Sequence, residues 1–208
     1  MGYYIFSCGI KKIQIDRAFG SESAEILEKV IQNNLFEGYS HFEVQGLDKT
    51  PLQALNDIIY GRSCDEKSNY AYGYALIGIC TTLGVELPYI QEIKLGYETD
   101  LINKFLLDDY AVENFLIEHA LFGDNSNPFP IPTIKDWPLI GLLTLAQLKE
   151  IKARLKHVVI SDVMIENFLD AEEEEEEEKG FASEHIQGLL ANIDFCIENE
   201  LDMISFCH

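Results

Sequence analysis

Strand-like segments stand at the two ends of this 208-residue chain, and helical patterns fill most of the sequence between them. Residues 3–8 (YYIFSC) are aromatic and β-branched, and residues 203–207 form a short apolar segment. Because a short strand is not stable alone, we expect these two to pair in one sheet. Residues 139–143 are a further candidate strand. The pattern predicts a helix-rich single α+β domain over residues 1–208, with a small sheet that includes the N- and C-terminal strands.

The clearest helix start is at Thr50, where Pro51 occupies the first helical position and Gln53 completes a capping box. This helix is expected to reach Tyr60 and to end at Gly61. A proline-rich loop is expected over residues 124–138. Further helices are expected over residues 11–19, from a cap at Ser21 to Ile31, over residues 70–83, 99–107, 109–122 and 144–155, from a cap at Ser161 or Asp162, and over residues 183–199.

The charge of the chain limits its partners. Hydrophobic residues make up 47% of the sequence, which is enough to form a core, and the formal net charge is −21. Such a chain lacks the Lys and Arg that phosphate contacts need, so we expect it to bind no nucleic acid and no anionic membrane. The same charge accelerates encounter with basic proteins, so a basic protein is the expected partner. The sequence leaves the oligomeric state open.

Seven consecutive glutamates occupy residues 172–178. Such runs are normally solvated loops or frayed helix ends, because neighbouring like charges repel. We therefore interpret residues 171–180 as an acidic, mobile insert that folding does not require. The alternative is that the run attracts a basic partner.

The five cysteines are irregularly spaced, which fits neither a disulfide framework nor a zinc site. Scattered reduced cysteines are typical of the cytosol. The N-terminus resembles no signal peptide, and the uncharged residues 68–85 have the composition of a buried helix rather than of a membrane span. The predicted location is cytoplasmic.

No motif predicts a cofactor or a metal. Gly73 and Gly78 have the spacing of a phosphate-binding loop, but Ile79 and Cys80 replace the required Lys and Ser/Thr, so helix–helix contact is the better interpretation. Residues 124–135 resemble a calcium loop but lack its Gly and its final Glu. The histidines are dispersed; His119, on an apolar helical face, is expected in the core.

Three residues are candidates for a binding site, and none is assigned a catalytic role. Trp137, the only tryptophan, follows Asp136 on the proline-rich loop and could anchor a partner or simply pack the loop onto the core. His208 follows Cys207 at the C-terminus. Adjacent strand residues point to opposite faces, so we expect a core-facing Cys207 and an exposed His208 rather than an activated thiol.

Four segments together resemble an uncharacterised bacterial family: YYIFSCGIKKIQIDRAFGS, YAYGYALIGIC, IPTIKDWPLIGLLT and LDMISFCH. The matching positions are Gly20 and Ser21; Tyr72, Gly73, Tyr74, Ala75 and Leu76; Asp136, Pro138, Ile140 and Gly141; and Phe206 and His208. Cys207 departs from the tyrosine that is usual before the final histidine. The family has no established activity, so the resemblance implies a shared fold and no mechanism.

The preferred hypothesis is a small acidic cytoplasmic protein that binds another protein, as a regulator or an immunity component. Charge and the lack of any catalytic motif favour it. The alternative is an enzyme or small-molecule-binding protein whose site is assembled from dispersed residues near Asp136, Trp137 and His208. A nucleic-acid mimic is a third possibility, which would need acidic residues arrayed on one face. A deep polar pocket beside His208 would favour the second hypothesis.

Overall fold

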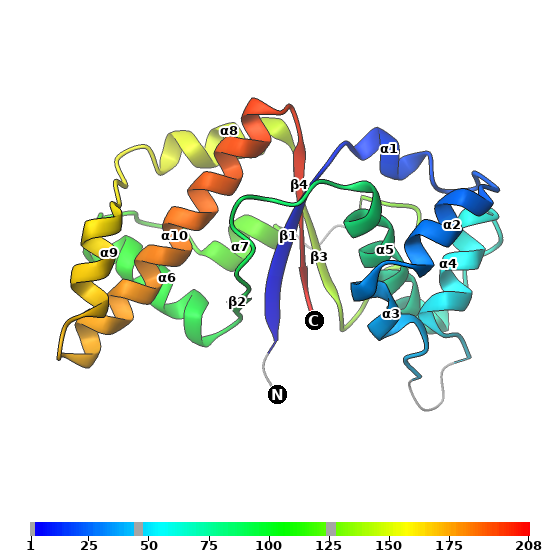
Figure 1. Ribbon diagram of the computed structural model, residues 1–208, viewed down its shortest axis with the longest axis horizontal. Helices are drawn as coiled ribbons and strands as arrows, with labels where there is room; N and C mark the ends of the chain where they lie inside the picture. The colour runs from blue at the N-terminus through cyan, green and yellow to red at the C-terminus, as the bar shows by residue number, and fades with distance from the viewer. Residues whose placement is uncertain (1–2, 44–47, 124–127) are drawn as a thin grey trace.

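The computed structural model describes residues 3–43, 48–123 and 128–208, and these form an antiparallel sheet between two helical layers (Figure 1). The strand order is β2-β1-β4-β3. The strands are β1 (Tyr4–Ile10), β2 (Ile93–Lys94), β3 (Leu139–Leu143) and β4 (Asp202–Cys207). The terminal strands pair from Ile5 opposite Cys207 to Ile10 opposite Asp202. The predicted helix-rich α+β fold and its terminal strand pair are confirmed.

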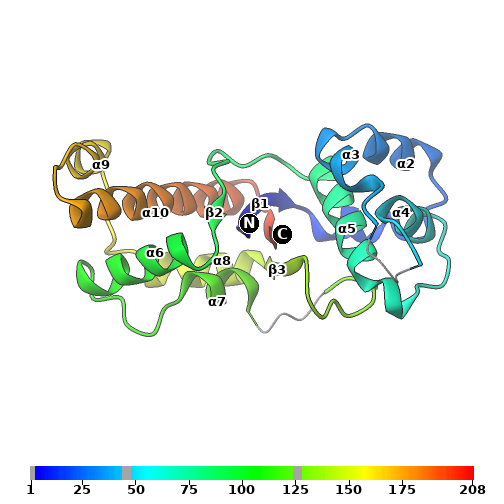
Figure 2. The same cartoon turned by 90° about the horizontal axis from the view of Figure 1, so that it is seen from below.

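The helices divide between the two faces of the sheet in the order of the chain. Helices α1 to α5 cover one face and α6 to α10 the other (Figures 1 and 2). Their bounds are α1 (Lys12–Asp16), α2 (Ala24–Ile31), α3 (Asn34–Ser40), α4 (Pro51–Ile59), α5 (Asn69–Leu83), α6 (Tyr97–Asp108), α7 (Ile117–Phe122), α8 (Leu145–Arg154), α9 (Asp162–Leu169) and α10 (Glu174–Glu198). In the described chain, no helix is both long and apolar enough to cross a membrane.

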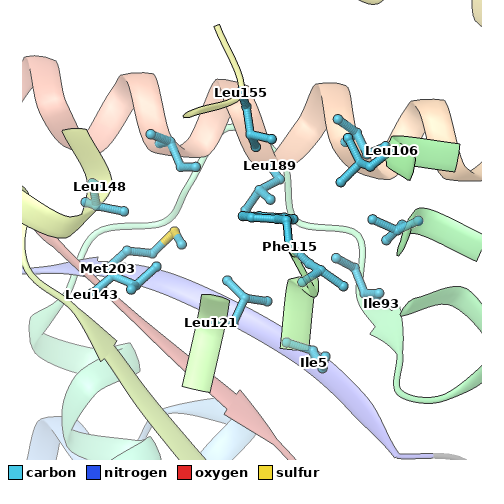
Figure 3. Packing of buried hydrophobic residues seen from close by; sticks show 14 of the residues in the cluster. Ile5, Ile93, Leu106, Phe115, Leu121, Leu143, Leu148, Leu155, Leu189 and Met203 are labelled. Carbon is cyan, nitrogen blue, oxygen red and sulfur yellow. The ribbon is translucent and has the colours of Figure 1, made fainter. Parts of the chain in front are cut away.

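Strand β4 contributes to a hydrophobic cluster on each face. Met203 and Cys207 join the cluster beneath α6 to α10, whereas Ile204 and Phe206 join the one beneath α1 to α5. Figure 3 shows Leu189 of α10 and Phe115 lying between that helix and the strands. Because both faces are covered, β4 has apolar residues on both of them instead of the alternation typical of half-solvated antiparallel strands, and Ser205 is the one polar residue between Met203 and Cys207.

Several helices begin or end at the residues that the sequence predicts. Thr50 and Gln53 form the capping box of α4, and Gly61 has the left-handed φ of +62° that suits a residue just after a helix. Ser161 caps α9. One prediction was wrong: Ser23, not Ser21, caps α2, and its hydroxyl accepts a hydrogen bond from the Ile26 amide. Two serines precede this helix, and either has the right chemistry.

The helix predicted over residues 109–122 is mostly absent, because α7 covers only its last turns. Ala111 and Asn114 have positive φ values of 51° and 54°, which interrupt a right-handed helix. Val112 and Phe115 are nevertheless buried, so the apolar spacing reflected packing of an irregular segment. The prediction for His119 was also wrong, since this residue is exposed on α7.

The predicted contact through small residues is confirmed at Gly78. A Cβ there would lie 2.5 Å from the Phe36 ring of α3 and 3.0 Å from Val30 of α2. Gly73 instead allows the proline-rich loop to approach, because a Cβ there would lie 2.8 Å from Pro138. The segment 124–127, where the calcium-loop motif begins, lies outside the described residues.

Most of the glutamate run belongs to α10, which begins nine residues earlier than the predicted helix. Negative charge at a helix N-terminus is favourable because it faces the positive end of the helix dipole. Glu175 lies 3.3 Å from Lys104 of α6, and Glu176 lies 2.9 Å from Lys179. These are exposed or partly exposed pairs, whose individual contributions to stability are small.

We predict that folding does not require residues 172–178. Replacing all seven glutamates by glutamine should shift the melting temperature by less than about 4 °C, because lost surface ion pairs are offset by relieved repulsion. Their amides should exchange quickly with solvent, as in a frayed helix end. Protected amides together with a larger loss of stability would show that the run is structural.

Candidate functional site

Trp137 and His208, two of the predicted site residues, lie at the same end of the sheet, where β1 begins and β4 ends (Figures 1 and 2). Leu139 of β3 is opposite Cys207 of β4, so Trp137 precedes the start of β3 beside the place where His208 ends the chain. Asp136, the third, is exposed next to Trp137. The antiparallel pairing therefore brings together residues that are some 70 positions apart in the sequence.

Trp137 and His208 nevertheless lie against opposite faces of the sheet. The Trp137 ring stacks on Tyr3, with centroids 3.8 Å apart and planes 8° from parallel, and it packs against the cluster beneath α6 to α10. His208 contacts the other layer, where its Nε2 lies 2.9 Å from the Tyr39 hydroxyl. The alternation of strand side chains explains this separation.

His208 is half-buried among aromatic rings, so the prediction of an exposed terminal histidine was wrong. Its ring meets Phe6 edge-on at 5.5 Å and Tyr39 at 5.1 Å. Burial lowers the pKa of His208, and the charge of Glu92 opposes this shift. Cys207 faces the core as predicted, and burial raises the pKa of its thiol to about 12. A protonated thiol on the opposite face is not a nucleophile activated by His208.

We call the surface formed here the aromatic rim. Phe42 and Tyr3 are its most exposed members, at 51% and 47%. Asp136 precedes Trp137 in the sequence. Burial raises the pKa of Tyr39, and the nearby Tyr74 and Glu92 add to this shift. The rim consists of Tyr3, Tyr39, Phe42, Tyr74, Trp137 and His208. Sequence reasoning identified only its last two members, because the others approach through tertiary contacts.

A pocket lies next to the rim, along the edge of β1. Residues 85–93, which we call the strap, lead from α5 to β2 and pair with β1 only near their two ends. Between these contacts the strap and β1 border an open pocket with a volume of about 290 Å³. Phe6 belongs to the lining of this pocket and also contacts the ring of His208.

The strap is fastened to α10 through Tyr89. Asn192 holds its main chain with two hydrogen bonds, one to the amide and one to the carbonyl, both 2.9 Å long. The Tyr89 ring covers Gly188, where a Cβ would lie 2.2 Å from it. The Tyr89 hydroxyl lies 2.9 Å from Nδ1 of buried His185, whose Nε2 is 3.3 Å from Glu98 of α6. This network of contacts could not be predicted from the sequence, because its residues come from three separate segments.

We predict that His185 makes the stability of the protein depend on pH. Burial lowers its pKa, although Glu98 and Glu184 oppose this shift, so the folded protein holds a neutral imidazole that the unfolded chain protonates more readily. The stabilisation is therefore present above the unfolded pKa of about 6.5 and is lost as the pH falls through the folded pKa.

The matched comparison is between the wild type and His185→Gln in urea unfolding. The stability advantage of the wild type should shrink as the pH falls from about 7.5 to about 5. Using the difference between the two proteins removes the general effect of protonating the many carboxylates. An advantage that is constant or grows at low pH would contradict the assignment of a neutral buried histidine.

A second polar cluster stabilises the other layer. Asp57 of α4 is buried and accepts hydrogen bonds from Lys49 and, at 2.8 Å, from the Tyr72 hydroxyl. The same hydroxyl accepts a hydrogen bond from the Asp65 amide at 3.0 Å. The cluster ties the segments before α4 and before α5 to the core.

In the part of the chain that the structure describes, no three His, Cys, Asp or Glu side chains are grouped to hold a metal ion.

Comparison with known proteins places the whole chain in one family. Neither a curated protein nor a solved structure matches it. A family model described as a domain of unknown function, DUF7691, matches residues 1–208. This match confirms the resemblance to an uncharacterised family and extends it over the full sequence. The chain is therefore a member of the DUF7691 family.

Proposed function

We propose that this chain is a protein-binding protein of the cytoplasm that takes a basic partner protein at the aromatic rim, as a regulator or an immunity component. The observation that carries the proposal is the gathering of partly exposed rings, beside Asp136 and Glu92, on a molecule with a net charge of −21. The acidic charge brings the partner close, and the rim provides the specific contacts.

The composition of the rim suits an interface. Tyr and Trp are enriched at the energetic centres of protein interfaces, because they bury a large area and lose little conformational entropy. Trp137 and Tyr3 are stacked on each other, which fixes both rings before binding. Arg and Lys side chains bind ring faces by cation–π interaction and bind carboxylates by ion pairing. A basic partner satisfies both chemistries at once.

The cysteines support the proposed location. All five are free thiols, and four of them are buried. Free thiols persist in a reducing compartment. Burial raises the pKa of Cys8 to about 12, so this thiol serves as a small apolar side chain in the core.

The small-molecule alternative at Asp136, Trp137 and His208 has less support. Trp137 and His208 are separated by the sheet, so one compact ligand does not reach both. The pocket beneath the strap is lined by none of the three. A protein surface, by contrast, spans the end of the sheet without difficulty.

The test is a binding measurement with a basic protein captured from the native host at low salt and then purified. Trp137→Ala and Phe42→Ala should each weaken binding by about 30-fold, the effect typical of a central aromatic anchor. Replacing the glutamate run by glutamine should have a smaller effect. Binding should also weaken steeply as salt rises from about 0.1 M to about 1 M, where the screening length falls from about 10 Å to about 3 Å.

Phe181→Ala is the matched control, because Phe181 is 40% exposed but lies on α10, where its neighbour Gly180 packs against Leu169 of α9, away from the rim. It should change the affinity less than about twofold. A partner that binds all three alanine variants equally well would place the interface elsewhere. If no protein is captured while a metabolite library stabilises the chain against heat, the small-molecule hypothesis replaces this one.

A further inference from the structure

One residue of β1 has no main-chain hydrogen-bond partner, among the residues that the structure describes, on the side that faces the strap. In β1, even-numbered residues bond to β4, since the amides and carbonyls of Tyr4 and His208 are paired. The odd-numbered residues therefore point their main-chain groups towards the strap. Ile5 pairs with Ile93, and Gly9 exchanges two hydrogen bonds with Val85.

Ser7 is the odd-numbered residue between these two contacts. Between Val85 and Ile93 the strap has more residues than β1 has opposite them, so it bows away from Ser7. Among the described residues, none pairs with the Ser7 amide or carbonyl on this side. Ser7 belongs to the lining of the pocket, so a donor and an acceptor face the cavity together. This is the arrangement that a carboxamide complements with two hydrogen bonds.

Three further polar groups of the lining are occupied by partners within the protein. The Ser7 hydroxyl bonds to that of Ser205 at 2.8 Å, and the Thr81 hydroxyl bonds to the Ile77 carbonyl at 2.9 Å. Asn192 is occupied by the main chain of Tyr89. Pairing with a carboxamide inside the pocket therefore falls to the Ser7 main chain, while the exposed Glu86, Gln91 and Glu92 belong to the outer part of the lining.

The rest of the pocket specifies the shape and charge of the ligand. Ile5, Leu121 and Leu189 contribute apolar surface, and the volume of 290 Å³ is about twice that of a cavity that holds benzene. Glu86 and Glu92 are exposed members of the lining, so negative charge surrounds the entrance. Such an entrance attracts a cation and repels an anion.

We propose that the strap pocket binds a small molecule with a branched apolar body, a carboxamide and an amino group, as in the amide of an aliphatic amino acid. The carboxamide pairs with the amide and carbonyl of Ser7, the apolar body fills the cavity, and the ammonium group faces Glu86 and Glu92. The site lies next to the aromatic rim, with which it shares Glu92, but the proposal does not depend on the proposed protein partner. The strap, held by Tyr89 and Asn192, forms the outer wall.

Three probes with one carbon skeleton separate these features: 2-amino-4-methylpentanamide, 4-methylpentanamide and 4-methylpentanoate. They are titrated into the full-length protein near pH 7, and binding is followed by amide NMR spectra. The aminoamide should bind best, the neutral amide should bind more weakly and the carboxylate weakest. The Ser7 amide resonance should move with both amides, because they form a hydrogen bond to it.

The charge contribution is tested with the double variant Glu86→Gln and Glu92→Gln, which changes only exposed side chains. Its affinity for the aminoamide should fall roughly threefold to tenfold, while its affinity for the neutral amide should be unchanged. The matched control replaces Glu113 and Glu150, exposed residues elsewhere, and should change either affinity less than about twofold.

Several outcomes would overturn the proposal. One is that neither amide binds at about 10 mM, the range expected for so small a ligand. Another is that the carboxylate binds as tightly as the amides. A third is that the probes move other resonances while that of Ser7 stays in place, which would show that they bind elsewhere.

Discussion

Deletion of residues 203–208 is expected to abolish the cooperative thermal unfolding of this protein. The segment forms most of β4, which pairs with β1 on one side and β3 on the other. Met203, Ile204, Phe206 and Cys207 are all fully buried, and they alternate between the two hydrophobic clusters. Removing one large buried side chain typically costs about 2–5 kcal/mol. The cost of removing the whole strand therefore exceeds the free energy of unfolding of a typical protein, which is about 5–15 kcal/mol.

The control for this deletion is a chain that lacks only His208, which is half-buried and contributes hydrogen bonds at the edge of the rim. It should melt cooperatively at a slightly lower temperature. Calorimetry of both truncated proteins distinguishes the role of the strand from that of the terminus. A sharp transition at the wild-type temperature after the longer deletion would rule out β4 as the central strand of the fold.

Gly141→Ala should cause the largest loss of stability among single glycine substitutions. A Cβ at Gly141 would lie 2.1 Å from the Leu121 carbonyl oxygen and 2.6 Å from the Phe122 Cα, so the backbone of α7 would have to move off β3. Overpacking against backbone costs about 3 kcal/mol. The melting temperature should therefore fall by roughly 6–12 °C.

Gly38→Ala is the matched control, because a Cβ there meets nothing within 4 Å and the residue lies inside α3. Alanine favours helix over glycine by about 1 kcal/mol, so this variant should melt at or above the wild-type temperature. If both substitutions have equal effects, the close approach of α7 to β3 is not a determinant of stability.

The parts of the fold that depend on local chemistry could be predicted from the sequence. The capping boxes at Thr50 and Thr144 act within four residues, and both begin helices in the structure. The pairing of the terminal strands could also be predicted, because both are short and apolar and a short strand is not stable alone. These features require no knowledge of distant contacts.

The parts that failed depend on tertiary contacts or on backbone geometry. The apolar spacing predicts a helix at residues 109–116, whereas the positive φ values of Ala111 and Asn114 make this an irregular buried segment. Asp136, Trp137 and His208 could be predicted as candidates by their chemistry. The rings that accompany them, such as Tyr39 and Phe42, could not, because they approach His208 from a separate helical layer.

The binding of a basic partner at the rim can be measured most directly through the fluorescence of Trp137, the only tryptophan in the chain. The ligand is an arginine-rich peptide, and its control is the same peptide with each arginine replaced by neutral citrulline. The arginine peptide should change the emission saturably, with an affinity that falls between about 0.1 M and about 1 M salt. Phe42→Ala should weaken this response and Phe181→Ala should leave it unchanged. An emission that is unaffected by the arginine peptide, or that responds equally to both peptides, would contradict the account.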